Sequence, residues 1–369
     1  MRTLVTGGLG FIGSHLVHRL LSQGDEVVVL DSLEEQVHGT AQPQVAQDVE
    51  VIVANVGDAD AAARALQRVD RVVHLAAAVG VGQSMYEIDR YVRQNTQATA
   101  TFLEQGVTVR DRVGRLVVAS SMSIYGEGEY ACATHGRVAP GPRPESQLSG
   151  RDWEVHCPEC GTPVQPAGTR ETKPLLPTSV YAITKRDHEE LSLVVGAAYG
   201  IPSVACRFFN VYGPGQALSN PYTGVAAIFA SRLLNGRPPI IFEDGAQSRD
   251  FIHVSDIVEG LVSALTTDSA TGRSLNLGTG RASTIVDVAR ALAAGLGVDV
   301  EPVVNGQYRA GDIRHCYADV GAAELYLDFR AKVTLEDGMA DLVRWLVTQE
   351  ASDKVDLATA ELSSRGLAR

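Results

Sequence analysis

The stretch TLVTGGLGFIGSHLVHRLLSQ, residues 3–23, decides the fold of this 369-residue chain. It begins as a short apolar and β-branched run, passes through glycines at 7, 10 and 13, and continues with helical periodicity. A strand that ends in a glycine turn at the start of a helix is the first half of a βαβ unit. The stretch therefore predicts a strand, a turn and a helix that packs back on the strand.

The same alternation continues along the chain. Helical stretches are expected after the first glycine turn, from about residue 58, and over 85–104. Buried strands are expected at EVVVL, VIV, RVVHLAA, GRLVVASS and PSVACRFF. This order predicts an α/β fold with a doubly wound parallel sheet of the Rossmann type, covered by helices on both faces.

The rhythm divides the chain into regions. The predicted sheet domain takes residues 1–125 and 175–207. Residues 126–174 are rich in Gly, Pro and polar side chains, and are too long for a plain loop, so we interpret them as an insertion. Residues 208–350, including the run SLNLG, predict a smaller mixed α/β region that binds substrate. Residues 351–369 are polar, and we expect a mobile tail.

Composition limits the partners. The chain has 44 acidic and 32 basic residues, a formal charge of −12, so a surface for nucleic acid or anionic membrane is not expected. No apolar run reaches the roughly 18 residues that span a bilayer. MRTLVTGG already starts a strand, without the pattern of a signal peptide. Five cysteines, three of them in one short segment, favour a reducing cytoplasm over a disulfide framework.

The glycine turn predicts a dinucleotide. Glycines allow the backbone to approach a pyrophosphate closely, and the helix N-terminus attracts its negative charge. The second strand ends at Asp31, whose carboxylate would accept hydrogen bonds from the adenosine ribose and repel a 2′-phosphate, so NAD is favoured over NADP. Asp58, which follows Val56-Gly57, would lie at the adenine or act only as a helix N-cap.

The pair in YAITK, Tyr181 and Lys185, is spaced one helical turn apart and would share one helix face. A tyrosine acts as a general base near neutral pH only if its pKa falls several units below about 10. A lysine ammonium and an oxidised nicotinamide can do this. The strand LVVASS offers a hydroxyl partner at Ser120 or Ser121. Ordinary amphipathic helices also carry such pairs, so the remaining motifs have to decide.

The motifs GGLGFIG, LAAAVGVGQS, ASSMSIYG, YAITK, RFFNVYGPG and RDFIHVSD follow in this order. Together they resemble the extended short-chain dehydrogenase/reductase family, in particular its nucleotide-sugar epimerases and dehydratases, from residue 3 to about 345 without the insertion. The resemblance implies Tyr181 as base, Lys185 as the residue that lowers its pKa and binds the nicotinamide ribose, and Ser121 as donor to the sugar oxygen. It also implies tightly bound NAD and a homodimer through helices near Met85 and Val180.

The resemblance further implies the binding residues. Those for NAD are Gly7, Gly10, Phe11, Ile12, Gly13, Asp31, Val56, Asp58, Ala76, Ala77, Asn95 and Ser120, with the catalytic pair. Those for a nucleotide-diphosphate sugar are Ser84, Ser123, Asn210, Arg249, Arg309 and Asp312. The physics supports two arginines at a diphosphate, because each guanidinium can form bidentate bonds that a lysine cannot reproduce.

The departures from the family pattern bear on the reaction. Met122 and Ser123 stand where the family's dehydratases carry an acidic pair, which speaks against dehydration and weakens a decarboxylase reading. A redox-neutral use of NAD remains, in which a sugar hydroxyl carbon, most plausibly C4, is oxidised and then reduced on its other face. Two motifs, YGPGQALSNPYTGVAAIF and YRAGDIRHCYAD, are most similar to bacterial dTDP-L-rhamnose 4-epimerase-like proteins, with UDP-hexose 4-epimerases next. A decarboxylase or 4,6-dehydratase that recruits its acid elsewhere, and a non-catalytic NAD-binding interaction protein, are the alternatives.

The insertion carries a second signal. Cys132-x-x-His135 is followed after 21 residues by Cys157-x-x-Cys160, the spacing of two zinc knuckles around a closed, structural, tetrahedral site. His156 is a rival fourth ligand, and a metal-free loop with reduced thiols is the alternative. Because the insertion separates the Ser121 and Tyr181 regions, we expect that it could cover the sugar pocket.

Overall fold

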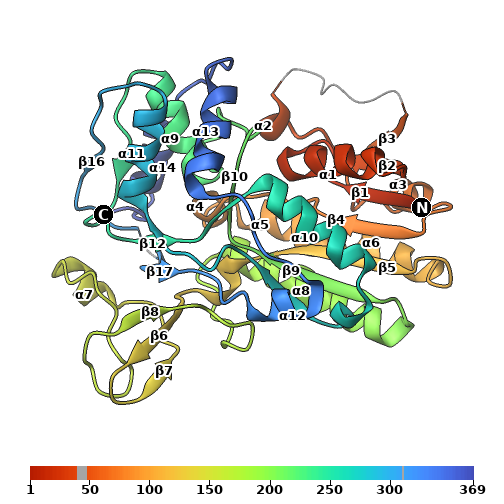
Figure 1. The fold of residues 1–369 in the computed structure, drawn as a ribbon, viewed down its shortest axis with the longest axis horizontal. Coiled ribbons are helices and arrows are strands. Elements are labelled where there is room, and N and C mark those ends of the chain that lie inside the picture. Colours follow the sequence, from red (N-terminus) through yellow and green to blue (C-terminus); the bar gives the residue numbers. More distant parts are fainter. Residues whose placement is uncertain (40–47, 310) are drawn as a thin grey trace.

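The computed structural model describes residues 1–39, 48–309 and 311–369, and its centre is a seven-stranded parallel sheet (Figure 1). The strand order is β14-β9-β5-β4-β1-β2-β3. The strands are β1 (Arg2–Thr6), β2 (Glu26–Asp31), β3 (Val49–Val53), β4 (Arg71–His74), β5 (Arg115–Ser121), β9 (Ser203–Phe208) and β14 (Ser274–Leu277). Every neighbouring pair is parallel, as the alternation of strands and helices predicts.

The order of the strands reverses at β1. The chain runs from β1 outward to β2 and β3, and then returns to β4 on the other side of β1. In open parallel sheets the crevice at such a switch point, beyond the carboxyl ends of the strands, is where ligands bind. The predicted Rossmann-type sheet is confirmed.

Helices cover both faces of the sheet. On one face, α1 (Phe11–Ser22) packs against α10 (Val254–Thr266), and α12 (Gly321–Leu327) lies beside them. On the other face lie α3 (Ala59–Ala65), α6 (Ala98–Thr108) and α8 (Val180–Tyr199). Strands buried on both faces need continuous apolar runs, which is why VVVL and LVVA could be recognised in the sequence.

Two predicted elements differ from the structure. The run SLNLG was assigned to the substrate region, but β14 pairs with β9 as the edge strand of the main sheet. The helix predicted over 85–104 begins only at Ile88 and runs through α5 (Ile88–Tyr91), a π-helix (Val92–Gln97) and α6, and the separate short α4 (Val81–Ser84) precedes it. The interruption has a local cause, since Asn95 in the π-helix bonds the backbone of a neighbouring loop; such π segments often mark functional sites.

The substrate region stands beside the sheet's carboxyl edge (Figure 1). Its helices α9 (Val225–Leu234), α11 (Ile285–Gly295) and α13 (Leu335–Leu346) share one apolar core. The region also contains three small sheets, which pair β10 (Asn210–Tyr212) with β13 (Phe251–His253), β11 (Ile240–Ile241) with β16 (Val303–Val304), and β12 (Ser248–Arg249) with β15 (Ser283–Thr284) and β17 (His315–Cys316).

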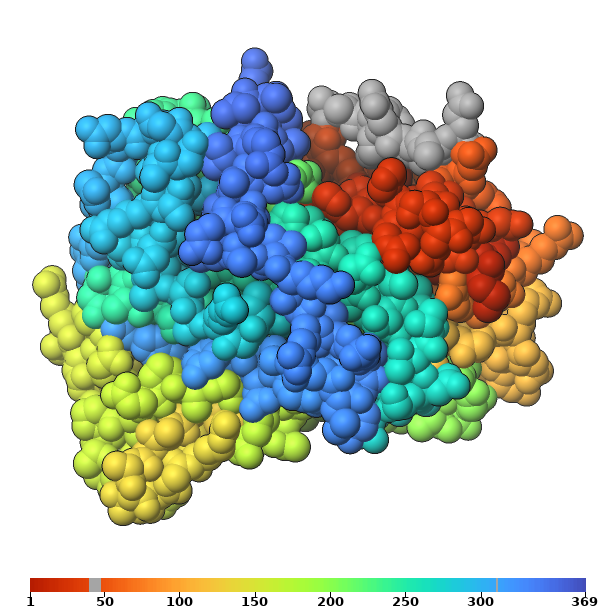
Figure 2. Space-filling model, in the orientation of Figure 1, coloured from red at the N-terminus to blue at the C-terminus, as the bar shows by residue number. Residues whose placement is uncertain are grey.

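The insertion is a small folded unit. It contains an antiparallel sheet of β7 (Gly136–Val138), β6 (Glu129–Cys132) and β8 (Gln165–Ala167). The short α7 (Glu145–Ser149) lies between β7 and β8 in the chain. Tyr130, Val138, Val155 and Val164 are buried together within it. Figure 2 shows the insertion as a yellow to yellow-green lobe at the lower left of the molecule.

The expectation of a mobile tail is wrong. Residues 355–364 form α14, in which Ala358 and Leu362 are buried. Asp356 pairs with Arg232 at 2.6 Å, and the backbone of Arg369 exchanges two hydrogen bonds with Tyr308. The polar composition hid an amphipathic helix whose apolar positions are few but well placed.

Among the helices of the described ranges, none is long and apolar enough to cross a bilayer. All five cysteines are free thiols.

Candidate active site

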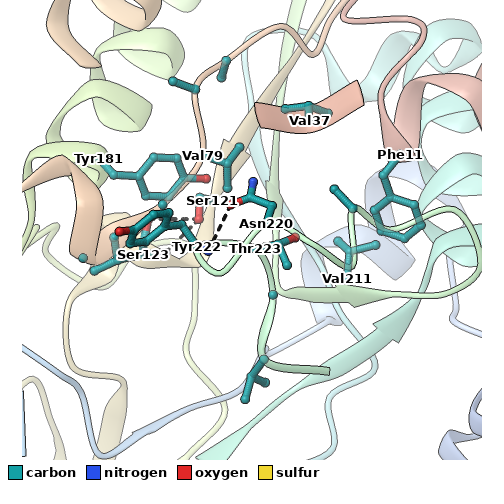
Figure 3. A pocket seen from close by; sticks show the side chains of 18 of the residues that line it. Phe11, Val37, Val79, Ser121, Ser123, Tyr181, Val211, Asn220, Tyr222 and Thr223 are labelled. Carbon is teal, nitrogen blue, oxygen red and sulfur yellow. Dashed lines mark hydrogen bonds between the residues drawn. The ribbon is translucent and has the colours of Figure 1, made fainter. Parts of the chain in front are cut away.

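A cavity of about 730 Å³ opens at the switch point of the sheet and continues toward the substrate region. The glycine turn lines one part of it, the start of α8 lines another, and β10, α9 and α14 close the remainder. In Figure 3, Tyr181, Ser121 and Ser123 lie at one end of the view, and Phe11 and Val211 at the other. The dinucleotide motif and the Tyr-x-x-x-Lys motif therefore share one cavity.

The glycine turn is packed so tightly that side chains cannot be added. A Cβ atom on Gly13 would lie 2.1 Å from the carbonyl oxygen of Gly7, and one on Gly7 would lie 2.9 Å from the amide nitrogen of Ala76. Gly7 also has a φ of +65°, which favours glycine. The carboxylate of Asp31 accepts hydrogen bonds from the amides of Leu9 (3.0 Å) and Leu33 (2.9 Å), so it fixes the turn as well as facing the cavity.

Most residues predicted to contact NAD line this cavity. They are Gly7, Gly10, Phe11, Ile12, Gly13, Asp31, Val56, Ala76, Ala77 and Ser120. Asp58 does not line it, because its carboxylate caps α3 by accepting the Ala61 amide at 3.0 Å. Asn95 is fully buried behind the wall, where it bonds both the amide and the carbonyl of Ala78 and the hydroxyl of Thr184. Asn95 thus shapes the channel from behind.

Helix α8 places Tyr181 and Lys185, the pair that the sequence predicts to be catalytic. Ser179 caps its first turn by accepting the Ala182 amide at 3.1 Å, and both Tyr181 and Lys185 line the cavity. Ser84, predicted to contact substrate, is fully buried and outside the lining; its hydroxyl accepts the backbone amide of Tyr181 at 3.0 Å. Ser84 therefore positions the helix that carries the tyrosine, a role that its motif did not reveal.

Burial dominates the electrostatics of the pair. It raises the pKa of Tyr181 to about 12, against a smaller lowering by the hydroxyl of Ser121. It lowers the pKa of Lys185 to about 7, opposed by the charge of Glu189. The lowered tyrosine pKa that the sequence predicts is therefore not produced by the polypeptide alone. A further positive charge, such as that of an oxidised nicotinamide, is needed to favour the phenolate.

The predicted sugar-nucleotide contacts other than Ser84 come together in the cavity. They are Ser123, Asn210, Arg249, Arg309 and Asp312. Ser123 donates to Ser121 at 2.9 Å. Arg309 pairs with Asp312 at 2.9 Å and lies over the ring of Phe242, whereas the guanidinium of Arg249 donates to backbone carbonyls. Arg309 and Arg249 thus both line the cavity, the first held by a carboxylate and the second by backbone carbonyls.

Two parts of the lining were missed by the sequence analysis. The loop of residues 215–224 contributes Asn220, Tyr222 and Thr223, and Asn220 accepts the Tyr222 amide at 3.0 Å (Figure 3). The motif YGPGQALSNPYTG had marked this loop as family-like without giving a role to its residues. Helix α14 contributes Ala358 and Leu362, and nothing in its composition indicated this.

The insertion contains the predicted cluster of metal ligands. One ligand atom from each of Cys132, His135, Cys157 and Cys160 lies within 4.8 Å of all the others. In a tetrahedral zinc site, with Zn–S about 2.3 Å and Zn–N about 2.0–2.1 Å, two sulfurs lie about 3.8 Å apart and a sulfur and a nitrogen about 3.5 Å apart. The sulfurs of Cys132 and Cys160 are 3.8 Å apart, and His135 Nδ1 lies 3.6 Å from Cys132 and 3.5 Å from Cys157. The residues therefore fit a tetrahedral ion.

The structure tests two expectations for the insertion, namely His156 as a rival ligand and the insertion as a cover of the sugar pocket. His156 pairs with Asp152 at 3.3 Å and is not part of the cluster, so His135 is the fourth candidate ligand. The insertion does not cover the sugar pocket, since no residue of 126–174 is among those that line the cavity. The insertion contacts the substrate region instead, where Arg143 bonds Glu243, Ser149 bonds Tyr308 and Glu154 bonds Arg314.

A glycine turn in a βαβ unit, a Tyr-x-x-x-Lys pair and a serine at the end of the adjoining strand, all in one cavity, define an enzyme of the short-chain dehydrogenase/reductase class. Within that class, the chain belongs to the NAD dependent epimerase/dehydratase family, whose model matches residues 3–145 and 157–278. The gap in this match falls inside the insertion.

Known proteins similar to this chain agree with that assignment. A dTDP-L-rhamnose 4-epimerase of Burkholderia thailandensis is 35% identical, over 94% of this chain and 95% of its own. The UDP-glucose 4-epimerase of Thermus thermophilus, solved as a complex with NAD, is 31% identical with a TM-score of 0.74, over 94% of this chain and 99% of its own. A UDP-N-acetyl-alpha-D-glucosaminuronate decarboxylase of Bacillus cytotoxicus is 26% identical, over 93% and 97%. The chain is thus an NAD-dependent enzyme of the nucleotide-sugar epimerase type, in the isomerase class.

Proposed function

We propose that this enzyme inverts C4 of the sugar in a nucleoside-diphosphate sugar through a transient 4-keto sugar, with a dTDP-6-deoxyhexose of the dTDP-L-rhamnose type as substrate. The observation that carries the proposal is the composition of the catalytic end of the cavity. Tyr181, Ser121 and Ser123 stand there together. The acidic residues in the described lining lie elsewhere: Asp31 bonds the glycine turn, Glu34 follows β2 and pairs with Arg90, and Asp312 pairs with Arg309.

The chain's own residues account for the proton chemistry. As phenolate, Tyr181 takes the proton of the sugar hydroxyl while Ser121 donates a hydrogen bond to the same oxygen. Lys185, one turn along the helix, favours the phenolate when charged. Bound NAD supplies the acceptor, and later the donor, of the hydride at the sugar carbon. After the ketose turns over, the phenol returns its proton to the new hydroxyl, so protons and hydride balance.

The cations of the lining argue against a sugar acid. A decarboxylase has to hold a carboxylate beside the reacting carbon, which favours a free cation there. Of the lysines and arginines in the described lining, Lys185 is committed to Tyr181 in the proposed mechanism, and Arg90 is paired with Glu34 and Glu87. Arg249 and Arg309 belong to the proposed diphosphate end. Val79, Met122 and Phe208 are the apolar neighbours at the catalytic end and suit the methyl group of a 6-deoxy sugar.

The test uses a panel of dTDP- and UDP-sugars, incubated with purified enzyme in D₂O without added cofactor and followed by NMR. We expect the C4 epimer to form with protium retained at C4, because the hydride is stored and returned. Deuterium at C5 with a persistent 4-keto product would instead show a dehydratase, and release of CO₂ from a uronate would show a decarboxylase. Either result would refute the epimerase proposal.

We also propose that Cys132, His135, Cys157 and Cys160 hold a structural Zn²⁺. Support comes from the tetrahedral spacing of the four ligand atoms, and four protein ligands leave no open position for catalysis. Metal analysis by mass spectrometry should find about one zinc per chain in reductant-treated protein. Protein without zinc under these conditions would remove this proposal.

A homodimer is proposed through α5, the π-helix and α8. These elements pack together and expose Ile88, Val92, Ile183 and Val194, a set of apolar side chains that a second copy would cover. Sedimentation velocity should show a dimer that Ile183→Asp dissociates. Val347→Asp, at an exposed apolar residue on another face, is the matched control. A monomeric parent protein would refute the proposal.

A further inference from the structure

The base of the insertion holds the backbone of a segment in the substrate region through one buried carboxylate. Glu127, only 2% exposed, accepts the amides of Arg314 (2.8 Å) and His315 (2.8 Å). It also accepts the hydroxyl of Tyr130 at 2.6 Å. Tyr130 lies on β6, two residues before the candidate metal ligand Cys132. The first pair of ligands is therefore connected to residues 314–315 by a short chain of buried contacts.

The opposite side of the same segment holds a cavity arginine. The carbonyls of Ile313 and Arg314 accept hydrogen bonds from the guanidinium of Arg249 at 2.7 and 2.9 Å. Because a peptide unit is planar and rigid, a displacement of the amides that Glu127 holds also moves the carbonyls that orient Arg249. The position of Arg249 in the cavity thus depends on the insertion behind it.

The second pair of ligands has its own connection. Glu154, three residues before Cys157, accepts the side chain of Arg314 at 2.5 Å. Arg314 is fully buried and also bonds Glu243 (3.1 Å), which in turn pairs with the buried Arg143 of the insertion at 2.7 Å. Buried ions are stable only when their partners stay in place, so loosening the knuckle would disturb this whole set of pairs.

We propose that the metal-bound insertion is a buttress for the nucleotide-binding segment 312–315, with Glu127 as the positioning residue that connects it to Arg249. The inference rests on the proposed function, because it takes Arg249 as a ligand of the nucleoside diphosphate, and on zinc as the ion. The amide of Tyr181 is held by Ser84, and Ser179 caps the same helix turn through the Ala182 amide; both serines lie outside the insertion. Loss of the buttress should therefore weaken nucleotide binding and leave the chemical step nearly intact.

The experiment titrates dTDP and UDP into the NAD-loaded enzyme by calorimetry and measures zinc and steady-state kinetics on the same samples. The variants are Glu127→Gln, which keeps all four ligands, and Cys160→Ser, which removes the exposed cysteine among them. Glu159→Gln, an exposed residue in the same knuckle, is the matched control. Unfolding midpoints of all samples separate a local effect from general loss of the fold.

Glu127→Gln should retain zinc, weaken dTDP or UDP binding and raise KM about tenfold, with kcat within about twofold, because one charge-assisted contact to the segment is lost. Cys160→Ser should lose zinc and bind the diphosphate at least as poorly, and the control should match the parent. A zinc-free Cys160→Ser protein, or a zinc-free parent, that binds the diphosphate normally would overturn the inference.

The outcomes also separate this inference from the proposed reaction. A parent that binds dTDP or UDP through Arg249 but makes no C4 epimer refutes the reaction and leaves the buttress standing. A parent that binds neither nucleotide refutes both. A fall in kcat with unchanged KM in Glu127→Gln would contradict the buttress alone, since the defect would then lie at the chemical step.

Discussion

Acid sensitivity offers a quantitative test of the packing below the catalytic helix. His74, on β4, is fully buried, bonds the hydroxyls of Thr6 (2.7 Å) and Thr99 (2.9 Å), and stacks on the ring of His188 at 5.2 Å. Burial, with the charge of Lys185, lowers the pKa of His74 to about 3, and the same two causes lower the pKa of His188 well below its ordinary value. The ring of His74 is therefore neutral in the folded protein at pH 5, and burial shifts the pKa of His188 in the same direction.

The sign follows from proton counting. Between pH 6.5 and pH 3 the unfolded chain protonates His74 and the folded chain does not, so stability falls as the pH falls through this window. Between pH 7 and pH 5 His74 costs RT ln(1 + 10^1.5), about 2 kcal/mol, relative to its value near pH 7. The lowered pKa of His188 acts with the same sign and adds to this loss.

The assay is urea unfolding followed by circular dichroism at pH 7 and pH 5, for the parent and for His188→Phe, which keeps an aromatic ring against His74. Other titrating groups are common to both proteins, so the pH-dependent loss should be smaller in the variant. His18→Gln removes an exposed histidine of α1 and should behave as the parent. An equal loss in parent and His188→Phe would show that the buried ring is not the source and would refute the reasoning.

Three further predictions concern the catalytic cavity. Gly13→Ala should prevent NAD retention, because the new methyl group would lie 2.1 Å from the carbonyl oxygen of Gly7, and the purified protein should then lack the cofactor. Gly106→Ala is the control and should retain NAD, because a Cβ atom there meets nothing within 4 Å. Lys185→Met should move the acid limb of the kcat profile upward by about two pH units, since Tyr181 loses its cationic neighbour; an unmoved limb would contradict this role. Ser84→Ala should lower the unfolding free energy by about 1–2 kcal/mol, because the amide of Tyr181 loses its buried acceptor; an unchanged value in urea unfolding would exclude that contact.

The sheet could be predicted because its strands are buried on both faces. Runs such as VVVL and LVVA have no polar positions, and the glycine turn fixes which strand begins the βαβ unit. The place of β14 in the main sheet was not predicted, because it pairs with a strand about seventy residues earlier in the chain. Helix α14 was not predicted because its two buried residues, Ala358 and Leu362, are too few to give a helical pattern among polar neighbours. Pairing and docking of this kind depend on contacts that no local pattern encodes.

At the site, residue identity was predictable and protonation was not. Motif spacing placed Tyr181, Lys185 and Ser121 in one cavity, because a helical turn and a strand end have fixed geometry. It could not reveal that burial would raise the tyrosine pKa and lower that of the lysine, since desolvation depends on the whole fold. The same limit explains Ser84 and Asn95, whose polar atoms serve the backbone instead of a ligand.

The arginines of one motif show where sequence reasoning has to give way to structure. YRAGDIRH contains Arg309, which faces the cavity, and Arg314, which is fully buried between Glu154, Glu243 and Asp244. A buried guanidinium that loses one carboxylate partner is strongly destabilising, and one of the three partners comes from the insertion. Deleting the insertion would therefore remove Glu154 and leave the Arg314 charge with Glu243 and Asp244 alone, directly behind the segment that orients Arg249. The insertion is therefore part of the packing of this protein, because the segment that orients Arg249 folds against it.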